Sequence, residues 1–504
     1  MRMSDHEKEF IARIREIGQI DATGSVLDWD AEVNMPENGL TARAEQLSLL
    51  ARLAHERRTD PRLGELLDAL EKSPADEAME TNIRETRRAY DRAVKIPMEL
   101  IERIASVSTH AKDAWARARK ESAFQKFAPH LAELLDLKRQ VADAVGYKGE
   151  RYDALLDEFE PGATAAEVTT LFASLRGPLS DFVKQLAASS KKPDPAILAR
   201  RYPLDRQKLW SRQCAMLVGF NFDSGRIDES THPFCSGFNP GDVRLTTRYY
   251  ENFFPAAMFG TLHEAGHGLY EQGLDPAHNF TPRGSAASLG IHESQSRMWE
   301  NFVGRGRPFW ERYYGQCQTV FSEALSDVSI DDFYGAINAV SPSLIRVEAD
   351  EVTYNLHIIL RFEIERELIE KRLEVKDLPA AWNARIKDML GVTPETDADG
   401  CLQDIHWSMG AFGYFPTYAM GNLYAAQFFA AARRDMPDLE DQFRRGEFGG
   451  LLSWLRKNIH VHGMRFRPSE LVKNVTGAAL SIDPFMSYIR EKFAPVYGLS
   501  ASKS

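Results

Sequence analysis

Residues 255–272 read PAAMFGTLHEAGHGLYEQ and predict a helix that carries a pair of metal ligands. Pro255 suits the first turn of a helix, where its missing N–H is no loss, and Gly273 follows the run, where a helix end favours glycine. His263 and His267 stand at i and i+4, so their side chains lie on one face, one turn apart. Two imidazoles at this spacing can share one Zn²⁺.

Glu264 completes the HExxH pattern. It follows the first histidine and points beside the metal, where a general base for the attacking water belongs. The alternative is a buried helix with two hydrogen-bonded core histidines, which the apolar neighbours Phe259, Leu262 and Leu269 would also fit. A catalytic zinc site therefore needs a third protein ligand and an open fourth position.

Glu293 is the candidate for the third ligand, in the run HESQSR of residues 292–297. It opens what reads as a second helix, and Arg297, one turn on, could hold its carboxylate. His292 competes with it as a ligand. We rank Glu293 first because two histidines and one glutamate form a known catalytic zinc set. The predicted cofactor is one Zn²⁺ per subunit, for which Co²⁺ could substitute because geometry discriminates weakly between the two.

The composition narrows the class of protein. The chain has 504 residues, of which 43% are hydrophobic and 27% charged, as in ordinary folded proteins. A formal net charge of −11 and the lack of a dense basic block argue against a nucleic acid partner. No apolar run approaches the ~18 residues that span a bilayer, and the start carries charges, so we expect a cytoplasmic protein with no membrane partner. The cysteines form no CxxC pair, which argues against a thiolate zinc site: Cys214, Cys235, Cys317 and Cys401.

The remaining pattern is mostly helical. Apolar residues recur at three- and four-residue spacing over about residues 1–190, with Pro97 opening one helix. A short β-favouring run, residues 243–250, predicts a hairpin or small sheet. The helical pattern returns in residues 350–373, 423–434 and 451–459.

We predict a single domain over residues 1–504. Its N-terminal helical part covers about 1–190, and a second part, about 191–504, carries the metal site. The stretch SSKKPDP, residues 189–195, is the best candidate for a linker. We interpret it as a surface loop because linkers usually run longer or more uniform in composition.

Several further motifs are distributed along the chain. They read LDWDAEVNMP at residues 27–36, HPF at 232–234, DVRLT at 242–246, IRVEAD at 345–350 and GCLQDIHW at 400–407. Together with HEAGH and HESQ, they resemble the carboxypeptidase Taq family, the thermostable-type zinc carboxypeptidases, over nearly the whole length. No motif position departs from the family pattern.

The resemblance implies a mainly α-helical fold similar to the neurolysin-like peptidases, with a large helical body, a deep central groove and a small β element. It also implies a homodimeric metallocarboxypeptidase that removes single residues from peptides with a free C-terminus. Broad side-chain tolerance is expected, with proline disfavoured.

Recognition of a free C-terminus requires a cation for the terminal carboxylate, and arginine suits it through its two-pronged geometry. Arg346 is the first candidate and Arg244 the second. For each, the alternative is a structural ion pair, for example between Arg346 and Asp350 at i+4.

The resemblance implies that other motif residues line and close the groove and limit substrate length: His232, Asp242, Arg244, Gln403, Asp404 and His406. Loop anchoring is the alternative role for them. His406 and Tyr418 could instead donate hydrogen bonds to the tetrahedral intermediate, although an aromatic cluster such as that around Tyr418 is more often core.

Three other functions stay open. An endopeptidase or dipeptide-releasing peptidase could use the same scaffold, and amidation of the substrate's C-terminus separates it from a carboxypeptidase. An aminopeptidase is disfavoured because no acidic motif for a free amine stands out. A non-enzymatic helical binding protein would usually have lost Glu264 or one ligand, and here all are present.

Overall fold

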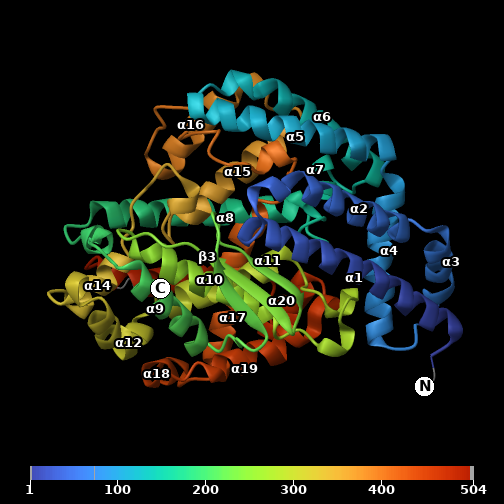
Figure 1. The fold of residues 1–504 in the computed structure, drawn as a ribbon. Helices are drawn as coiled ribbons and strands as arrows, with labels where there is room; N and C mark the ends of the chain where they lie inside the picture. The colour runs from blue at the N-terminus through green and yellow to red at the C-terminus, as the bar shows by residue number, and fades with distance from the viewer. Residues whose placement is uncertain (1–2, 73, 500–504) are drawn as a thin grey trace. The chain divides into compact units, whose positions relative to one another are not determined.

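The structure is a computed structural model that describes residues 3–72 and 74–499, most of which lie in helices (Figure 1). Within these residues the only sheet has three strands. The prediction of a mainly α-helical fold with a small β element is therefore confirmed. Among the residues described, we find no helix with the length and apolar character that crossing a membrane requires.

The chain divides into two compact units, each assembled from three separate stretches. Unit 1 comprises Met1–Val94, Asp194–Ile337 and Phe428–Ala479. Unit 2 comprises Lys95–Pro193, Asn338–Gln427 and Leu480–Ser504. The chain passes from unit 2 to unit 1 inside the SSKKPDP stretch. The single domain over residues 1–504 and the groove stay predictions.

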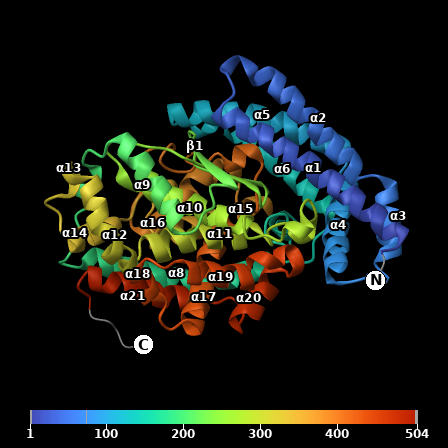
Figure 2. The same cartoon turned by 60° about the horizontal axis from the view of Figure 1, so that its bottom comes forward.

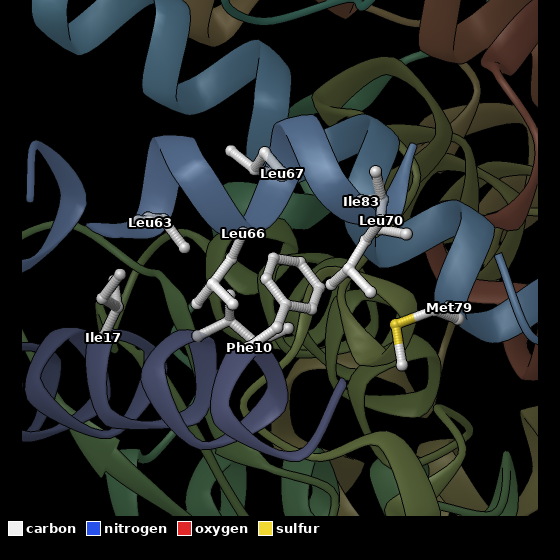
Figure 3. Packing of buried hydrophobic residues seen from close by; sticks show 9 residues of the cluster. Phe10, Ile17, Leu63, Leu66, Leu67, Leu70, Met79 and Ile83 are labelled. Atoms are coloured by element: carbon white, nitrogen blue, oxygen red, sulfur yellow. The ribbon is translucent and has the colours of Figure 1, made fainter. Parts of the chain in front are cut away.

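Unit 1 begins with four helices: α1 (Asp5–Val33), α2 (Leu40–Arg58), α3 (Pro61–Leu70) and α4 (Glu77–Lys95). Ser4 and Glu7 form a capping box at the start of α1, each side chain accepting from the backbone N–H of the other. Helices α1 and α2 pack along each other (Figures 1 and 2). Apolar side chains join α1, α3 and α4 into one cluster (Figure 3), in which Phe10, Leu63 and Leu67 are fully buried.

The centre of unit 1 is the sheet and the helix beside it. Strand β3 (Asp242–Thr247) lies in the middle, paired in parallel with β1 (Gly225–Glu229) and antiparallel with β2 (Cys235–Asn239). Helix α10 (Phe254–Glu271) packs against this sheet and against α9 (Leu204–Leu217) and α11 (Leu289–Arg297). Val243 and Leu245 of β3 are fully buried. The predicted β run and the predicted helix over residues 255–272 are both confirmed.

Beyond α11 the chain of unit 1 continues as a π-helical stretch, Met298–Gly304. Further helices complete the unit: α12 (Arg307–Val320), α13 (Ser322–Leu325), α14 (Ile330–Ile337), α18 (Leu439–Arg445), α19 (Gly449–Asn458) and α20 (Pro468–Thr476). A π-helical stretch changes the angular positions of the residues within it, and such stretches often lie at functional sites.

Within its described residues, unit 2 consists of helices joined by loops and contains no strand. Its helices are α5 (Met98–Glu121), α6 (Ala128–Val145), α7 (Arg151–Leu156), α8 (Ala165–Ala188), α15 (Tyr354–Ile369), α16 (Leu378–Leu390) and α21 (Asp483–Val496), and α17 (Pro416–Asp435) continues into unit 1. Pro97 stands at the N-cap of α5. Helix α15 is buried on nearly all sides, so the polar residues in its middle need partners inside the protein.

Candidate metal centre

Three side chains from two helices converge in unit 1. His263 and His267 come from α10, and Glu293 comes from α11. The Glu293 Oε2 atom lies 3.5 Å from His263 Nε2 and 3.4 Å from His267 Nε2. The ligand atoms lie within 4.8 Å of one another and could hold a metal ion, and no second such group occurs in the part of the chain that is described. Two imidazoles and one carboxylate suit zinc, so the residues fit the predicted cofactor.

Gly266 allows the two helices to come close enough for this arrangement. A Cβ atom at this position would lie 2.5 Å from the carbonyl oxygen of Gln295 and 2.6 Å from Cα of Ser296. Both contacts are with the backbone of α11, which cannot rotate away as a side chain can. Ser288 caps the start of α11, since its hydroxyl accepts from the Ile291 N–H at 3.0 Å. The third ligand therefore sits close beside the first two.

The Glu293 carboxylate is held on both oxygens. Its Oε1 accepts from Arg297 Nε at 2.7 Å, and its Oε2 accepts from the Ser296 hydroxyl at 2.9 Å. The prediction that Arg297 holds this carboxylate is confirmed. Burial alone would raise the pKa of Glu293, but the charges of Arg297 and His263 hold it well below its usual range. The carboxylate is thus ionised and oriented toward the histidines.

Glu300 orients His263 from its other side. The Nδ1 atom of His263 lies 2.9 Å from Glu300 Oε2, which leaves Nε2 facing Glu293. Arg297 and Arg305 approach the same carboxylate at 3.3 and 3.5 Å. Burial would raise the pKa of Glu300, but the hydrogen bond from His263 and the nearby Arg297 lower it to about 2. Sequence reasoning missed Glu300, although its place seven residues after Glu293 and three after Arg297 puts it on the same helix face.

His292 does not join the metal-binding group. Its Nδ1 lies 2.5 Å from His267 Nδ1, and its Nε2 lies 2.7 Å from Glu271 Oε1. Both ring nitrogens are therefore engaged with protein atoms. Sequence reasoning weighed His292 as a ligand and missed Glu271, whose only signal was its place one turn after His267 on the same face of α10.

The protonation states suit the chemistry of such a site. Burial raises the pKa of the Glu264 carboxyl to about 7, although the neighbouring His263 acts in the opposite direction. Burial, together with the nearby His292, lowers the pKa of His267 to about 3, so its imidazole is neutral at pH 7. Among the residues described, no donor is within hydrogen-bonding distance of the Glu264 carboxyl group. Its carboxyl can therefore exchange protons with a bound molecule.

A second polar cluster lies in unit 2 around Arg346. Its Nε donates to Asp404 Oδ1 at 2.9 Å, and its Nη1 donates to the Tyr354 hydroxyl at 3.1 Å. Arg361 Nε donates to the other oxygen of Asp404 at 2.6 Å. Gln403 Oε1 accepts from both the Arg346 backbone N–H and Arg361 Nη2, at 2.9 and 2.7 Å. Two arginines thus share one carboxylate. Arg361 was missed, although an arginine inside an apolar helix signals a buried partner.

The suggested i+4 ion pair between Arg346 and Asp350 is wrong. Residues Arg346–Glu348 form a short 3₁₀ turn, so the spacing of an α-helix does not apply. The Asp350 carboxylate instead accepts from the Ser341 backbone at 3.0 Å and from the Thr353 hydroxyl at 2.8 Å. Asp350 anchors its own loop.

His406 and Tyr418 lie beside the Arg346 cluster. The Tyr418 hydroxyl is 3.5 Å from His406 Nε2, and the Arg346 guanidinium stands 5.2 Å from the centroid of the Tyr418 ring. Burial lowers the pKa of His406 to about 4, so this imidazole is neutral at pH 7.

The remaining predicted residues lie in unit 1. Arg244 and Asp242 form a two-pronged pair at 2.9 and 2.8 Å, and the Arg244 guanidinium stacks on Trp29 at 4.3 Å. His232 is exposed, and its backbone carbonyl accepts from the Ser230 hydroxyl at 2.6 Å. Arg244 is therefore already neutralised by a protein partner, whereas Arg346 shares its partner with a second cation.

Known proteins resemble this chain over almost its whole length. Residues 9–493 match the family described as carboxypeptidase Taq (M32) metallopeptidase. Thermostable carboxypeptidase 1 of Thermus thermophilus is 47% identical, with 96% of this chain and 97% of that protein covered. Carboxypeptidase 1 of Bacillus subtilis is 40% identical, with 99% of this chain and 100% of that protein covered. The crystal structure of an M32 carboxypeptidase from Deinococcus radiodurans R1 superposes with a TM-score of 0.96 at 39% identity, covering 98% of this chain and 100% of that one.

Proposed function

The chain belongs to the carboxypeptidase Taq (M32) family of metallopeptidases, and from this premise we propose that it releases single C-terminal amino acids with the help of one Zn²⁺. Metal-dependent hydrolysis of peptide bonds by a carboxypeptidase follows from the family itself. The proposal adds the metal, the residues and the specificity. The observation that carries it is the convergence of His263, His267 and Glu293 at one point.

Within this proposal the two histidines and Glu293 hold the ion. A zinc ion supplies Lewis acidity, which polarises the scissile carbonyl and makes water acidic enough to lose a proton near pH 7. Co²⁺ can replace it, since the same ligands suit both ions.

Glu264 acts as the general base. It takes a proton from the attacking water and passes it to the nitrogen of the leaving amino acid. Its pKa of about 7 supports this role, because a carboxyl with a pKa near the working pH both accepts and returns a proton readily. The absence, within the described residues, of a hydrogen-bond donor to the Glu264 carboxyl supports it too.

Arg346 binds the C-terminal carboxylate of the peptide. Arg346 and Arg361 carry two positive charges against the single negative charge of Asp404, whose pKa these arginines hold below its usual range although burial opposes them. The nearby His357 and His406 are neutral at pH 7, because burial lowers their pKa values to about 3 and about 4. The hydrogen-bonded cluster therefore has one positive charge to spare.

The free edge of Arg346 supports the same role. No atom of the described residues accepts from Arg346 Nη2, and the Arg361 guanidinium is fully buried. A buried cation with an open donor favours an anionic ligand. The pairing of Arg244 with Asp242 makes Arg244 the weaker candidate.

The remaining roles are proposed on the resemblance and the local contacts. His406 and Tyr418 donate hydrogen bonds to the tetrahedral intermediate, and Asp404 holds Arg346 in place. His232 and Asp242 help to close the groove and limit substrate length. We also propose a cytoplasmic homodimer that accepts most C-terminal residues and disfavours proline.

Two peptides test the proposal by mass spectrometry with zinc present. One has an acetylated N-terminus and a free C-terminus, and the other is its C-amidated twin. A carboxypeptidase shortens only the free peptide, one residue at a time. Internal cleavage of both peptides would overturn the exopeptidase function while keeping the metal site. No cleavage of either peptide by zinc-loaded protein would point to a narrow substrate range or to an inactive relative.

A matched pair of arginine variants tests the carboxylate site. Arg346→Met should raise KM for the free peptide by roughly tenfold or more, since a hydrogen bond to a charged group contributes about 1.5–3 kcal/mol. Arg244→Met removes an arginine that is already paired and should change KM far less. Equal effects of the two variants would contradict the assignment to Arg346.

A further inference from the structure

We propose that His292 and Glu271 form a hydrogen-bonded relay that positions the metal ligand His267 and fixes its tautomer. The relay runs from His267 Nδ1 to His292 Nδ1 at 2.5 Å, and from His292 Nε2 to Glu271 Oε1 at 2.7 Å. His267 and Glu271 stand one turn apart on α10, and His292 reaches them from α11. The inference rests on the proposed metal site and gives His292 a positioning role in place of a ligand's role.

With His292 neutral and Glu271 ionised, one proton arrangement satisfies every contact in the relay. The Glu271 carboxylate can only accept, so His292 carries its proton on Nε2 and donates it to Glu271. His292 Nδ1 is then an acceptor, and His267 must donate from its own Nδ1. This leaves the lone pair of His267 on Nε2, the nitrogen that lies 3.4 Å from Glu293 Oε2. Glu271 thus selects, through His292, the tautomer of His267 that can bind a metal ion.

With His292 neutral, the same contacts disfavour the opposite tautomer of His267. A proton on His267 Nε2 would leave Nδ1 as an acceptor, and a neutral His292 would then have to donate from its own Nδ1. Its Nε2 would be left as a lone pair 2.7 Å from a carboxylate oxygen, which is a contact between two acceptors.

The surroundings leave room for the Glu271 carboxylate at this place. Gly237 on the edge strand β2 lies against it, and a Cβ atom there would come within 2.5 Å of Glu271 Oε2 and 2.7 Å of its Cδ. His292 and Glu271 are each only 18% exposed, so water competes weakly for their hydrogen bonds.

The two metal-binding histidines are thus held in different ways. His263 meets the carboxylate of Glu300 directly at 2.9 Å, whereas His267 reaches its carboxylate through a second imidazole. A partner that orients a metal ligand typically contributes 10- to 100-fold to metal affinity. We therefore expect the relay to matter for zinc retention, separately from any step of the reaction.

Zinc affinity in the full-length protein tests the relay, measured by competition with a chromophoric chelator. His292→Phe keeps a ring of similar size without nitrogen atoms and should weaken zinc binding by about 10- to 100-fold. Glu271→Gln keeps the shape and an acceptor oxygen but removes the charge, so its loss should be smaller. His462→Ala removes a half-buried histidine whose ring contacts Phe466, and it should leave zinc affinity unchanged.

The double variant His292→Phe/Glu271→Gln separates a relay from two independent structural effects. In a relay Glu271 acts only through His292, so the double variant should lose no more affinity than His292→Phe alone. Additive losses, or wild-type zinc affinity in His292→Phe, would overturn the proposal. Because the experiment measures metal binding, its result tests the relay independently of carboxypeptidase activity. If His292→Phe fails to fold, Glu271→Gln still tests the relay.

The alternative in which His292 is itself a ligand has its own signature. The visible absorption of Co²⁺ reports coordination number, so Co²⁺-loaded His292→Phe should keep the wild-type spectrum if His292 is only a positioning residue. A change to a spectrum of lower coordination number would show that His292 binds the metal and would overturn the relay.

Discussion

Replacement of Gly266 by alanine should separate loss of metal binding from loss of stability. The added Cβ would stand 2.5 Å from the Gln295 carbonyl oxygen, and ordinary contact begins at 3.4 Å. Helices α10 and α11 must therefore move apart by about 0.9 Å at this point. Metal–ligand distances tolerate only about 0.2 Å, so Glu293 would no longer complete the site. We expect zinc affinity to fall by roughly 100-fold or more, beyond the loss of an orienting partner.

The stability of Gly266→Ala should change less than its metal affinity. Overpacking costs about 1–3 kcal/mol, and alanine in a helix returns up to about 1 kcal/mol relative to glycine. Urea unfolding of the metal-free protein measures its stability, and competition with a chelator measures its zinc affinity. The variant should thus fold yet bind zinc poorly.

Two other glycine variants serve as controls. A Cβ at Gly268, on the same helix, would meet the side chains of Phe220 and Leu245 at 2.6 and 2.9 Å. Gly268→Ala should therefore destabilise the protein without moving α11. Gly24→Ala in α1 meets nothing within 4 Å and should be neutral or slightly stabilising. If Gly266→Ala matched Gly268→Ala in stability and kept wild-type zinc affinity, the close approach of α10 and α11 would not set the ligand geometry.

Three further predictions follow from single side chains. Glu264→Gln should keep zinc bound while kcat falls by about 10²- to 10⁴-fold, because proton transfer is lost; full activity in a steady-state assay would refute the base. Arg361→Met should raise KM more than it lowers kcat, because the whole charge of Asp404 would then offset that of Arg346. An unchanged KM for a peptide with a free C-terminus would contradict the charge argument. Burial raises the pKa of the Glu365 carboxyl from 4.5 to about 7. Between pH 4.5 and 7 this carboxyl therefore binds more protons in the folded than in the unfolded protein. The free energy of unfolding should fall as pH rises through this range, by at most about 3 kcal/mol. Glu365→Gln should flatten that part of the pH profile of urea unfolding, and an unchanged slope would refute it.

Local patterns in the sequence accounted for the helical fold and for the two histidines. Residues 255–272 form α10 as predicted, since helix periodicity depends only on neighbouring residues. The same reasoning placed Arg297 one turn from Glu293, where the two side chains meet at 2.7 Å. The family resemblance covers what periodicity cannot, namely the reaction class.

Contacts between distant segments could not be predicted in this way. Asp404 reaches Arg346 across 58 residues, whereas the sequence suggested the nearer Asp350. The strands β1 and β2 were not anticipated individually, because each is short and gains its place only by pairing with β3.

The spacing of residues in α10 alone determines that His263 and His267 share one face, because the backbone dihedrals of a single helix set that geometry. The tertiary structure decides which groups hold them: Glu300 for His263, and His292 with Glu271 for His267. Such hydrogen bonds require atoms placed to within a few tenths of an ångström. That precision arises where α10 approaches α11 at Gly266 and where Glu300 meets His263 across the two helices, and both depend on packing between segments rather than on the order of residues within one.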